Sequence, residues 1–184
     1  MSRRVVLSAV LIVGVLSIAV SGWQQPAAGR GGLNATPSGD ALQVEKLTDN
    51  LFVLRGGGGN TAAFITSTGV LLVDTKVSGW GQPILARLKT LTDKPITTIV
   101  NTHAHFDHVN GNAELPHVEV VTHQNTKMYM EQWNPIHGFP GDIPNPFRAS
   151  GGRGMPTRTF TDRLSLGRGS DQVDLYYYGR AHTG

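Results

Sequence analysis

The densest group of residues able to do chemistry lies in the segment NTHAHFDHVNGN, from Asn101 to Asn112. Three imidazoles and one carboxylate fall within six consecutive positions there: His103, His105, Asp107 and His108. Imidazole and carboxylate are ligands that suit Zn, Fe or Mn, and this many donors in so short a segment can hold two ions. Because the chain has no cysteine, a thiolate ligand is excluded. The segment therefore predicts a metal site, and the alternative is a polar loop at a strand end.

The elements around this segment predict how its side chains are positioned. A β-branched strand, ITTIVNTH (96–103), runs into it, and a strand would put His103 and His105 on the same side. Asp107 is expected near the N-cap of a short helix that folds the following side chains back beside this pair. Strand and helix patterns alternate along the chain, which predicts an α/β layered fold. Ligand sites of open α/β folds gather at the carboxyl ends of the strands, so the cluster is expected there.

The rest of the pattern predicts further strands at 51–56, in a hairpin over 62–74, at 118–123, and in the alternating stretches 157–166 and 172–179. Helices are predicted over 83–91 and from Asn125, a candidate N-cap. The continuous apolar run Val70 to Val73 predicts a strand buried on both faces.

Asn134 to Pro156 is a long Pro- and Gly-rich loop, which is typical of a functional or mobile segment. Trp133, which directly precedes the loop, could form an apolar substrate wall together with Phe139 and Phe147. The alternative is that the loop is an ordered surface excursion. The histidines outside the cluster are interpreted as surface or hydrogen-bonded loop residues: His117, His123 and His137.

The chain of 184 residues fits one domain. Its formal charge is only +3, and the sequence has no basic stripe of the kind that binds nucleic acid.

Arg3 and Arg4 precede the apolar run Val5 to Val20, which predicts a signal peptide over 1–21. The alternative is an uncleaved anchor, which would be the one expected contact with a membrane. Residues 22–40 read as a linker, and 41–184 as the folded domain. Either leader predicts export to the periplasm or the outside of the cell.

Three motifs carry a family resemblance. THAHFDH (102–108) resembles the H-x-H-x-D-H signature of the metallo-β-lactamase fold superfamily. GVLLVDT (69–75) resembles that family's first motif, with Asp74 as its aspartate, and GRAHTG (179–184) resembles the third, with His182 as its histidine. The resemblance covers Leu42 to Gly184 and implies an α/β (α+β) fold, the αββα sandwich.

The resemblance also implies roles for these residues. His103, His105 and His182 would bind a first metal ion, and Asp107 and His108 a second. Asp107 would also be catalytic, orienting the attacking water and receiving its proton. Asp74 would orient ligands by hydrogen bonds without touching metal. The alternative for Asp74 is an ordinary strand-end aspartate that caps a turn.

The activity implied is hydrolysis of a small-molecule substrate by a metal-activated water, on an ester, lactone, thioester or β-lactam bond. One or two Zn²⁺ ions are the expected cofactor, with Fe or Mn as other possibilities. Family members continue past the third motif, whereas this sequence ends two residues after His182, so the domain is expected to be incomplete at its C-terminus. Two alternatives stay open: an iron-dependent oxidoreductase on the same fold, and a fragment without catalytic activity.

Overall fold

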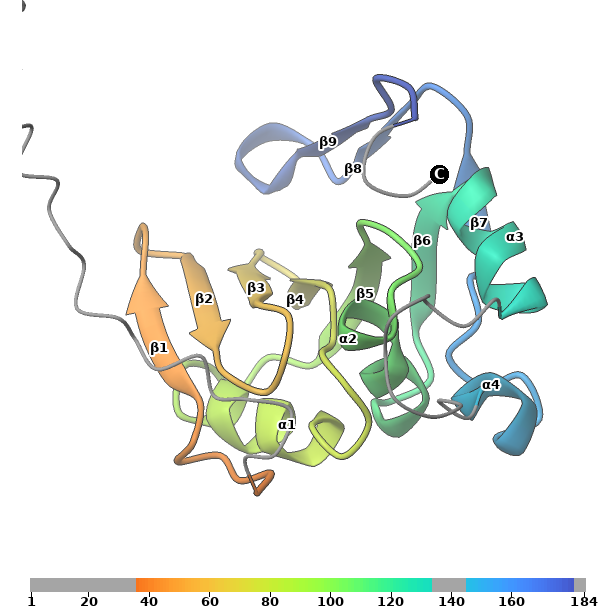
Figure 1. Cartoon of the computed structure of the whole chain (residues 1–184). Coiled ribbons are helices and arrows are strands. Elements are labelled where there is room, and N and C mark those ends of the chain that lie inside the picture. The colour runs from red at the N-terminus through yellow and green to blue at the C-terminus, as the bar shows by residue number, and fades with distance from the viewer. Residues whose placement is uncertain (1–35, 134–144, 181–184) are drawn as a thin grey trace, which may run out of the picture.

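The computed structural model describes residues 36–133 and 145–180, and its strands form two sheets (Figure 1). The larger sheet has seven strands, ordered as they occur in the chain: β1 Gln43–Lys46, β2 Leu51–Arg55, β3 Thr61–Ile65, β4 Val70–Val73, β5 Ile96–Asn101, β6 Glu119–His123 and β7 Arg158–Phe160. Neighbours are antiparallel from β1 to β4 and parallel from β4 to β7. The second sheet is an antiparallel pair, β8 Arg163–Leu166 and β9 Val173–Tyr176.

The helices are short and lie between or beside these strands: α1 Gly81–Lys89, α2 Phe106–Val109, α3 Gln124–Gln132 and α4 Pro146–Ala149, with 3-10 turns η1 Asn110–Glu114 and η2 Gly169–Asp171. Figure 1 shows α1 on one side of the large sheet and the β8–β9 pair on the other. No helix within the described ranges is long and apolar enough to cross a bilayer.

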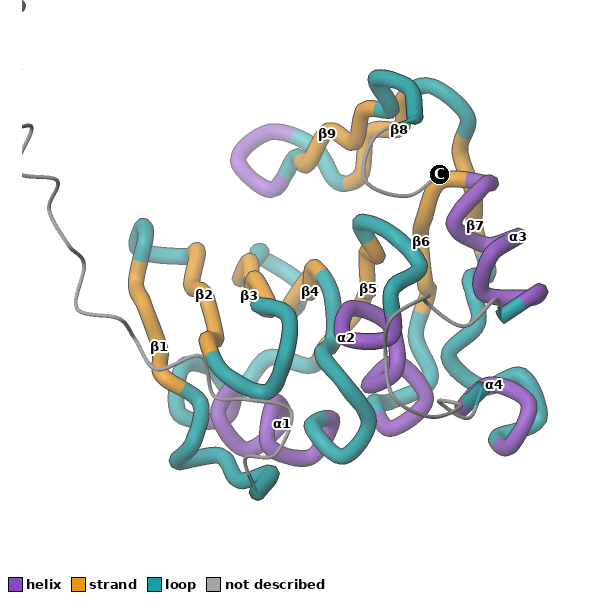
Figure 2. The backbone as a smooth tube through the Cα atoms, viewed as in Figure 1, coloured by secondary structure: helices purple, strands orange, loops and turns teal. Residues whose placement is uncertain are grey.

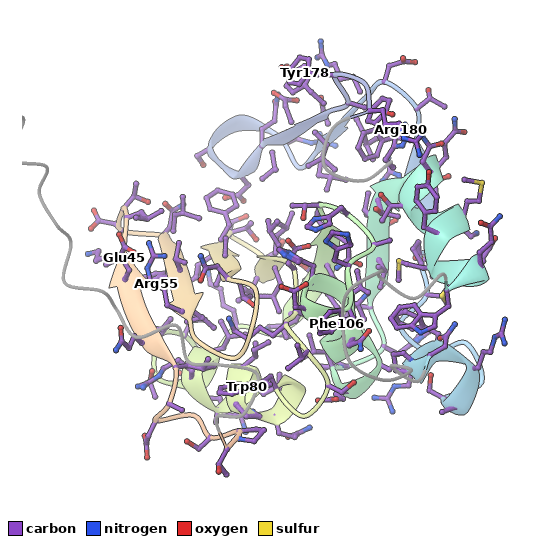
Figure 3. The ribbon with its side chains drawn as sticks, in the orientation of Figure 1. Glu45, Arg55, Trp80, Phe106, Tyr178 and Arg180 are labelled. Atoms are coloured by element: carbon purple, nitrogen blue, oxygen red, sulfur yellow. The ribbon has the colours of Figure 1, made fainter. Side chains whose placement is uncertain are left out.

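Apolar side chains fill both faces of the large sheet. On the α1 side Trp80, Ile84 and Leu88 pack with Leu72 and Ile99, and Figure 3 places Trp80 beside this helix. On the other side Leu71, Val100, Val121 and Leu166 form a separate cluster beneath the β8–β9 pair. Successive residues of a strand point to opposite faces, so Leu71 and Leu72 each serve a different cluster. The expected burial of β4 on both faces is therefore confirmed, and a helix, the large sheet and the β8–β9 pair lie in the order expected for part of an αββα sandwich.

The parallel strands bring three chemically important segments to one edge of the sheet. Asp74 follows β4 directly, the histidine cluster follows β5, and His123 is the last residue of β6. Because β4, β5 and β6 run in the same direction, their carboxyl ends lie at a common edge. Figure 2 shows the loops that leave these ends, and the expected position of the cluster is confirmed.

The prediction that His103 and His105 lie on a strand is wrong. β5 ends at Asn101, and both histidines lie in the loop that follows it. The strand ends there because the next N–H, that of Thr102, donates to the Asp74 side chain at 2.8 Å instead of to a neighbouring strand. His105 is the N-cap of α2, and Asp107 is the second residue of that helix. The histidines therefore meet through the turn and not through strand alternation.

Two other boundaries differ from the prediction. The N-cap of α3 is His123 and not Asn125, because the His123 ring accepts a hydrogen bond from the Asn125 N–H. The stretch 157–166 forms two strands in different sheets, since β7 pairs with β6 and β8 pairs with β9. Between them the Asp162 carbonyl accepts a bond of 2.8 Å from Tyr177 N–H, where the chain passes from one sheet to the other.

The predicted long loop is not irregular throughout its described part. Asn145 caps α4 by accepting hydrogen bonds from the N–H groups of Phe147 and Arg148. Phe147 is 2% exposed and packs with Val109 and Met130, so it belongs to the core and not to a substrate wall. Phe139 and His137, together with the predicted leader and most of the linker, lie outside the described residues.

Candidate metal centre

Asp74 begins the site, and its backbone is held in an uncommon conformation. The residue has a φ of 61°, a left-handed conformation that asparagine and aspartate tolerate better than most residues. Its N–H continues the β4–β5 ladder by donating to the Val100 carbonyl at 2.9 Å. The residue is 4% exposed. Strand pairing therefore fixes the position of a buried carboxylate at the sheet edge.

Three donors converge on this carboxylate. Thr102 donates its N–H to Oδ1 at 2.8 Å and its hydroxyl to Oδ2 at 2.6 Å. The Nδ1 of His108 lies 2.7 Å from Oδ2. A carboxylate can only accept, so the proton of this contact is on His108 Nδ1. The other ring nitrogen, Nε2, is then left to face the site.

The same carboxylate also sets the tautomer of His103, through Thr102. The Thr102 hydroxyl lies 2.9 Å from His103 Nδ1. A hydroxyl has a single hydrogen, and that of Thr102 is donated to Asp74, so the Thr102 oxygen accepts from His103 Nδ1. One buried aspartate thus directs the protons of two histidines to Nδ1. In both rings Nε2 keeps the lone pair that a metal ligand needs.

The histidine rings lie close together around this point. The ring centroid of His103 is 4.6 Å from that of His105 and 4.1 Å from that of His108. Asp74, His103 and His108 each offer one ligand atom in a group within 4.8 Å. The donors are imidazole nitrogen and carboxylate oxygen, which is the donor chemistry of zinc, iron and manganese sites. The residues therefore fit a transition-metal ion.

The turn around α2 is what brings His108 back toward His103. The N–H groups of His108 and Val109 both donate to the His105 carbonyl, at 2.9 and 3.2 Å. Phe106 and Val109 are buried and anchor the turn, which leaves Asp107 and His108 partly exposed at the site. The Asp107 carboxylate lies 3.6 Å from His108 Nε2.

The electrostatic environment acts on His108 in both directions. Burial lowers its pKa, but the hydrogen bond to Asp74 and the charges of Asp74 and Asp107 outweigh burial and raise the pKa above its ordinary value; the charge of Lys76 partly opposes them. A raised pKa means that a metal ion must compete with a proton for this ring.

A buried polar network supports the turn from below. The His108 carbonyl accepts from Thr75 N–H at 2.8 Å and from the Asn101 amide at 3.3 Å. Asn112 joins the two, since its oxygen accepts from Thr75 at 2.7 Å and its amide donates to Asn101 at 2.7 Å. Thr75, Asn101 and Asn112 are all buried, so the main chain at His108 is fixed by groups from the segment after β4, from the end of β5 and from η1.

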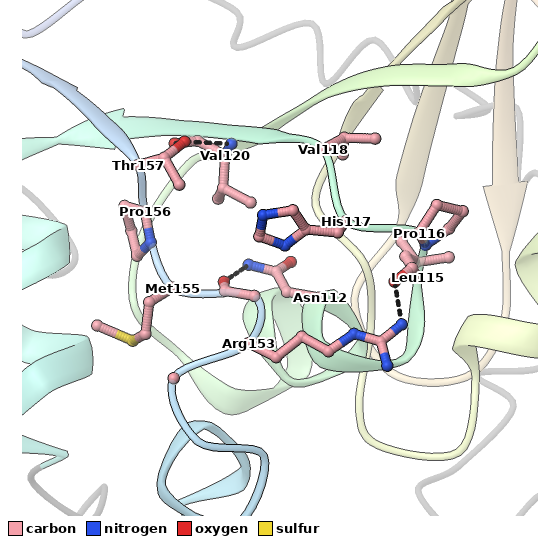
Figure 4. A pocket seen from close by; sticks show the side chains of 12 residues that line it. Asn112, Leu115, Pro116, His117, Val118, Val120, Arg153, Met155, Pro156 and Thr157 are labelled. Carbon is pink, nitrogen blue, oxygen red and sulfur yellow. Dashed lines mark hydrogen bonds between the residues drawn. The ribbon is translucent and has the colours of Figure 1, made fainter.

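A cavity of about 140 Å³ lies apart from this cluster (Figure 4). Asn112, His117 and Arg153 contribute to its lining, and Arg153 donates to the Leu115 carbonyl at 2.9 Å. None of the predicted site residues that the structure describes lines this cavity. It is therefore separate from the metal centre.

The structure brings together most of the predicted residues. Asp74 and the residues of the H-x-H-x-D-H motif lie at one sheet edge, whereas His182 lies outside the described residues. His117 is exposed, as expected. His123 is hydrogen-bonded, to the Thr161 carbonyl at 2.8 Å, but it is 6% exposed and ends β6, so it is neither a surface nor a loop residue; its ring also stacks on Tyr177 with centroids 3.7 Å apart.

Sequence reasoning missed the residues that hold the site: Thr75, Lys76, Asn101, Thr102 and Asn112. Their one sequence signal is position, because they directly follow Asp74 or lie at the ends of the histidine segment. Burial lowers the pKa of Lys76 to about 7, although the charge of Asp74 opposes this shift.

Residues 54–184 match the sequence model of the metallo-beta-lactamase superfamily. The chain belongs to this superfamily. It is 27% identical over 176 residues to the metallo-beta-lactamase type 2 of Elizabethkingia meningoseptica. The aligned region covers 85% of this chain and 61% of that protein. A segment of 65 residues is 35% identical to part of the linear primary-alkylsulfatase of Pseudomonas sp. (strain ATCC 19151). This segment is 35% of this chain and 12% of that enzyme.

Solved structures of the superfamily share the fold. BJP-1, a subclass B3 metallo-beta-lactamase of Bradyrhizobium japonicum, matches with a TM-score of 0.56 and 22% identity, over 74% of this chain and 51% of that chain. The chain thus spans 61% of the length of the Elizabethkingia protein and 51% of that of BJP-1. The αββα fold of the superfamily is confirmed for the part that the chain contains.

Proposed function

We propose that this chain is the metal-binding part of a metal-dependent hydrolase that uses zinc. The observation that carries the proposal is the gathering of three imidazoles at the carboxyl edge of the sheet, where the His103 ring centroid lies 4.6 Å from that of His105 and 4.1 Å from that of His108. Membership of the metallo-beta-lactamase superfamily supports it.

We assign His103, His105 and His182 as ligands of a first zinc ion, and Asp107 and His108 as ligands of a second. Distance alone would also allow Asp74 to be a ligand, since it belongs to the same 4.8 Å group. We favour an orienting role because both of its oxygens already accept hydrogen bonds, from Thr102 and from His108. Partners of this kind hold a ligating ring in one tautomer and one orientation.

A zinc ion bound there would lower the pKa of a water molecule toward neutrality and stabilise negative charge that develops on the substrate. Asp107 is the catalytic residue that we assign, because its carboxylate is partly exposed beside His108 Nε2. It would orient the attacking water and accept the proton that the water loses. Asp74 and Thr102 would keep the imidazoles fixed meanwhile, so that no reorganisation is needed during the reaction.

The substrate that we infer is a small molecule with an ester, lactone, thioester or β-lactam bond. The names of the two curated relatives, a β-lactamase and an alkylsulfatase, support hydrolysis without choosing one bond. Fold by itself cannot choose, because one fold carries many chemistries. We also infer that residues 1–21 are a signal peptide and that the domain acts in the periplasm or outside the cell.

The test is a hydrolysis panel with nitrocefin, a thioester, a lactone and an alkyl sulfate, run on the zinc-loaded chain and on the chain treated with chelator. Zinc-dependent turnover of one substrate that disappears in His103→Ala is the expected result. If zinc binds stoichiometrically but nothing is turned over, the chain is an inert fragment under these conditions. Stoichiometric iron after expression, without ester turnover, would replace the hydrolase proposal with a redox one.

A further inference from the structure

Lys76 has a buried amino group for which the proposed mechanism has no use. Its side chain is fully buried, and the residue lies two positions after Asp74 with a φ of 70°. The Nζ atom donates to the carbonyl oxygens of Leu54 and Gly59, at 2.8 and 2.7 Å. Burying an ammonium group is unfavourable, and these two hydrogen bonds offset part of the cost.

What Lys76 holds is the glycine loop, defined here as Gly56–Gly59, which connects β2 to β3. Its two carbonyl partners lie just before the loop and at its last residue. Gly56, Gly57 and Gly58 have φ values of 106°, 71° and 93°, which glycine adopts readily. Because all four loop residues are glycines, the loop has no side chain with which to hold itself in place. Lys76 therefore supplies the anchor that the loop sequence lacks.

The opposite side of the glycine loop rests on the proposed metal ligands. Gly59 N–H donates to the Asp107 carbonyl at 3.1 Å. A Cβ at Gly59 would lie 2.5 Å from that carbonyl oxygen and 3.0 Å from the His108 ring. A Cβ at Gly58 would lie 3.2 Å from the Asp107 Cβ. Gly59 thus stands between Lys76 and Asp107, held by its C=O on one side and by its N–H on the other.

We propose that Lys76 is a positioning residue for the second metal position: through Gly59 it holds the main chain of Asp107 and His108 in place. The inference rests on the proposed function, because it assumes that these two residues bind metal. His103 and Asp74 are held by a different set of contacts, centred on Thr102. A change at Lys76 should therefore affect His108 more than His103, whereas a purely structural lysine would affect both equally.

The test uses the 184-residue chain and the variant Lys76→Met, which keeps the length of the side chain and removes the donors. Two quantities are measured by NMR: hydrogen exchange of the Gly59 amide without metal, and the zinc response of each histidine ring. We expect exchange of the Gly59 amide to be at least about tenfold faster than in the original chain. The zinc dissociation constant measured from the His108 signal should rise about tenfold, which is the lower end of the effect seen when a residue that supports a metal ligand is replaced. The response of His103 should stay nearly unchanged.

A second variant covers the possibility that Lys76→Met does not fold. Gly59→Ala pushes on the same contact from the loop side and should also weaken zinc binding at His108 selectively. Its control is Gly39→Ala, at a glycine without a positive φ that lies against α1, where an added Cβ would lie 3.3 Å from the Ala86 Cβ. Unchanged exchange at Gly59 in folded Lys76→Met overturns the inference, and so does an equal loss at His103 and His108. An original chain with no zinc response at any histidine instead overturns the proposed function, and the inference falls with it.

Discussion

Replacing Asp74 with asparagine tests the part of the site that the structure defines most sharply. The carboxylate accepts from Thr102 N–H at 2.8 Å, from the Thr102 hydroxyl at 2.6 Å and from His108 Nδ1 at 2.7 Å. An amide has the same shape but only one acceptor atom. Whichever way it is turned, its NH₂ group faces a donor: Thr102 N–H in one orientation, His108 Nδ1 in the other.

The size of the effect follows from this mismatch. A buried donor that loses its acceptor costs about 1–3 kcal/mol, and about 1.4 kcal/mol corresponds to a factor of ten in binding. His108 can relieve the mismatch by moving its proton to Nε2, but that removes the lone pair that would bind metal. The cost therefore falls on the metal-binding form, and zinc affinity should drop about ten- to a hundredfold.

The measurement is a zinc titration against a competing chelator, together with imidazole nitrogen shifts that report the tautomers of His103 and His108. Asp93→Asn is the matched control, because Asp93 is exposed and removed from the site. A folded Asp74→Asn chain that binds zinc within twofold of the original would refute the orienting role. Loss of a whole equivalent of zinc, with the other site unchanged, would make Asp74 a ligand.

Three more changes have defined outcomes. His103→Ala should abolish zinc binding at the first position, because it removes one of the three imidazoles assigned there; a zinc content by elemental analysis equal to that of His117→Ala would contradict the assignment. Asn112→Ala should lower the free energy of unfolding in urea by about 1–3 kcal/mol, because Thr75 and Asn101 lose a buried partner; no loss would show that water replaces the amide. Burial lowers the pKa of Lys76 to about 7 from its ordinary 10.5, so between these values the unfolded chain holds a proton that the folded chain lacks. The free energy of unfolding of the metal-free chain, taken relative to Lys76→Met, should therefore rise with pH across that window, by up to about 1.4 kcal/mol per pH unit; a flat difference in urea titrations would contradict the shift.

Residue type and order were sufficient to predict the fold class and the place of the site. The apolar run of β4 and the β-branched run of β5 predicted central strands, and parallel strands deliver whatever follows them to one edge. Where prediction was wrong, side-chain hydrogen bonds had decided a local boundary. β5 stops at Asn101 because the next N–H, that of Thr102, donates to the Asp74 side chain, and α3 starts directly after His123 because the His123 ring caps the helix. Neither partner could be read from local periodicity.

The support of the site could not be predicted for a further reason: much of it acts through main-chain atoms. The carbonyl of Asp107 accepts from Gly59, and that of His108 accepts from Thr75 and Asn101. Every residue has a backbone carbonyl, so accepting such a hydrogen bond does not restrict which residue type stands at the position. The donors are ordinary residues as well, and Thr75 is 33 positions away from His108. Ligands are visible in a sequence because metal chemistry restricts their type, whereas their supports are restricted by position alone. Substitutions at Lys76 and Asn112 should therefore expose functional loss at residues that a motif search would pass over.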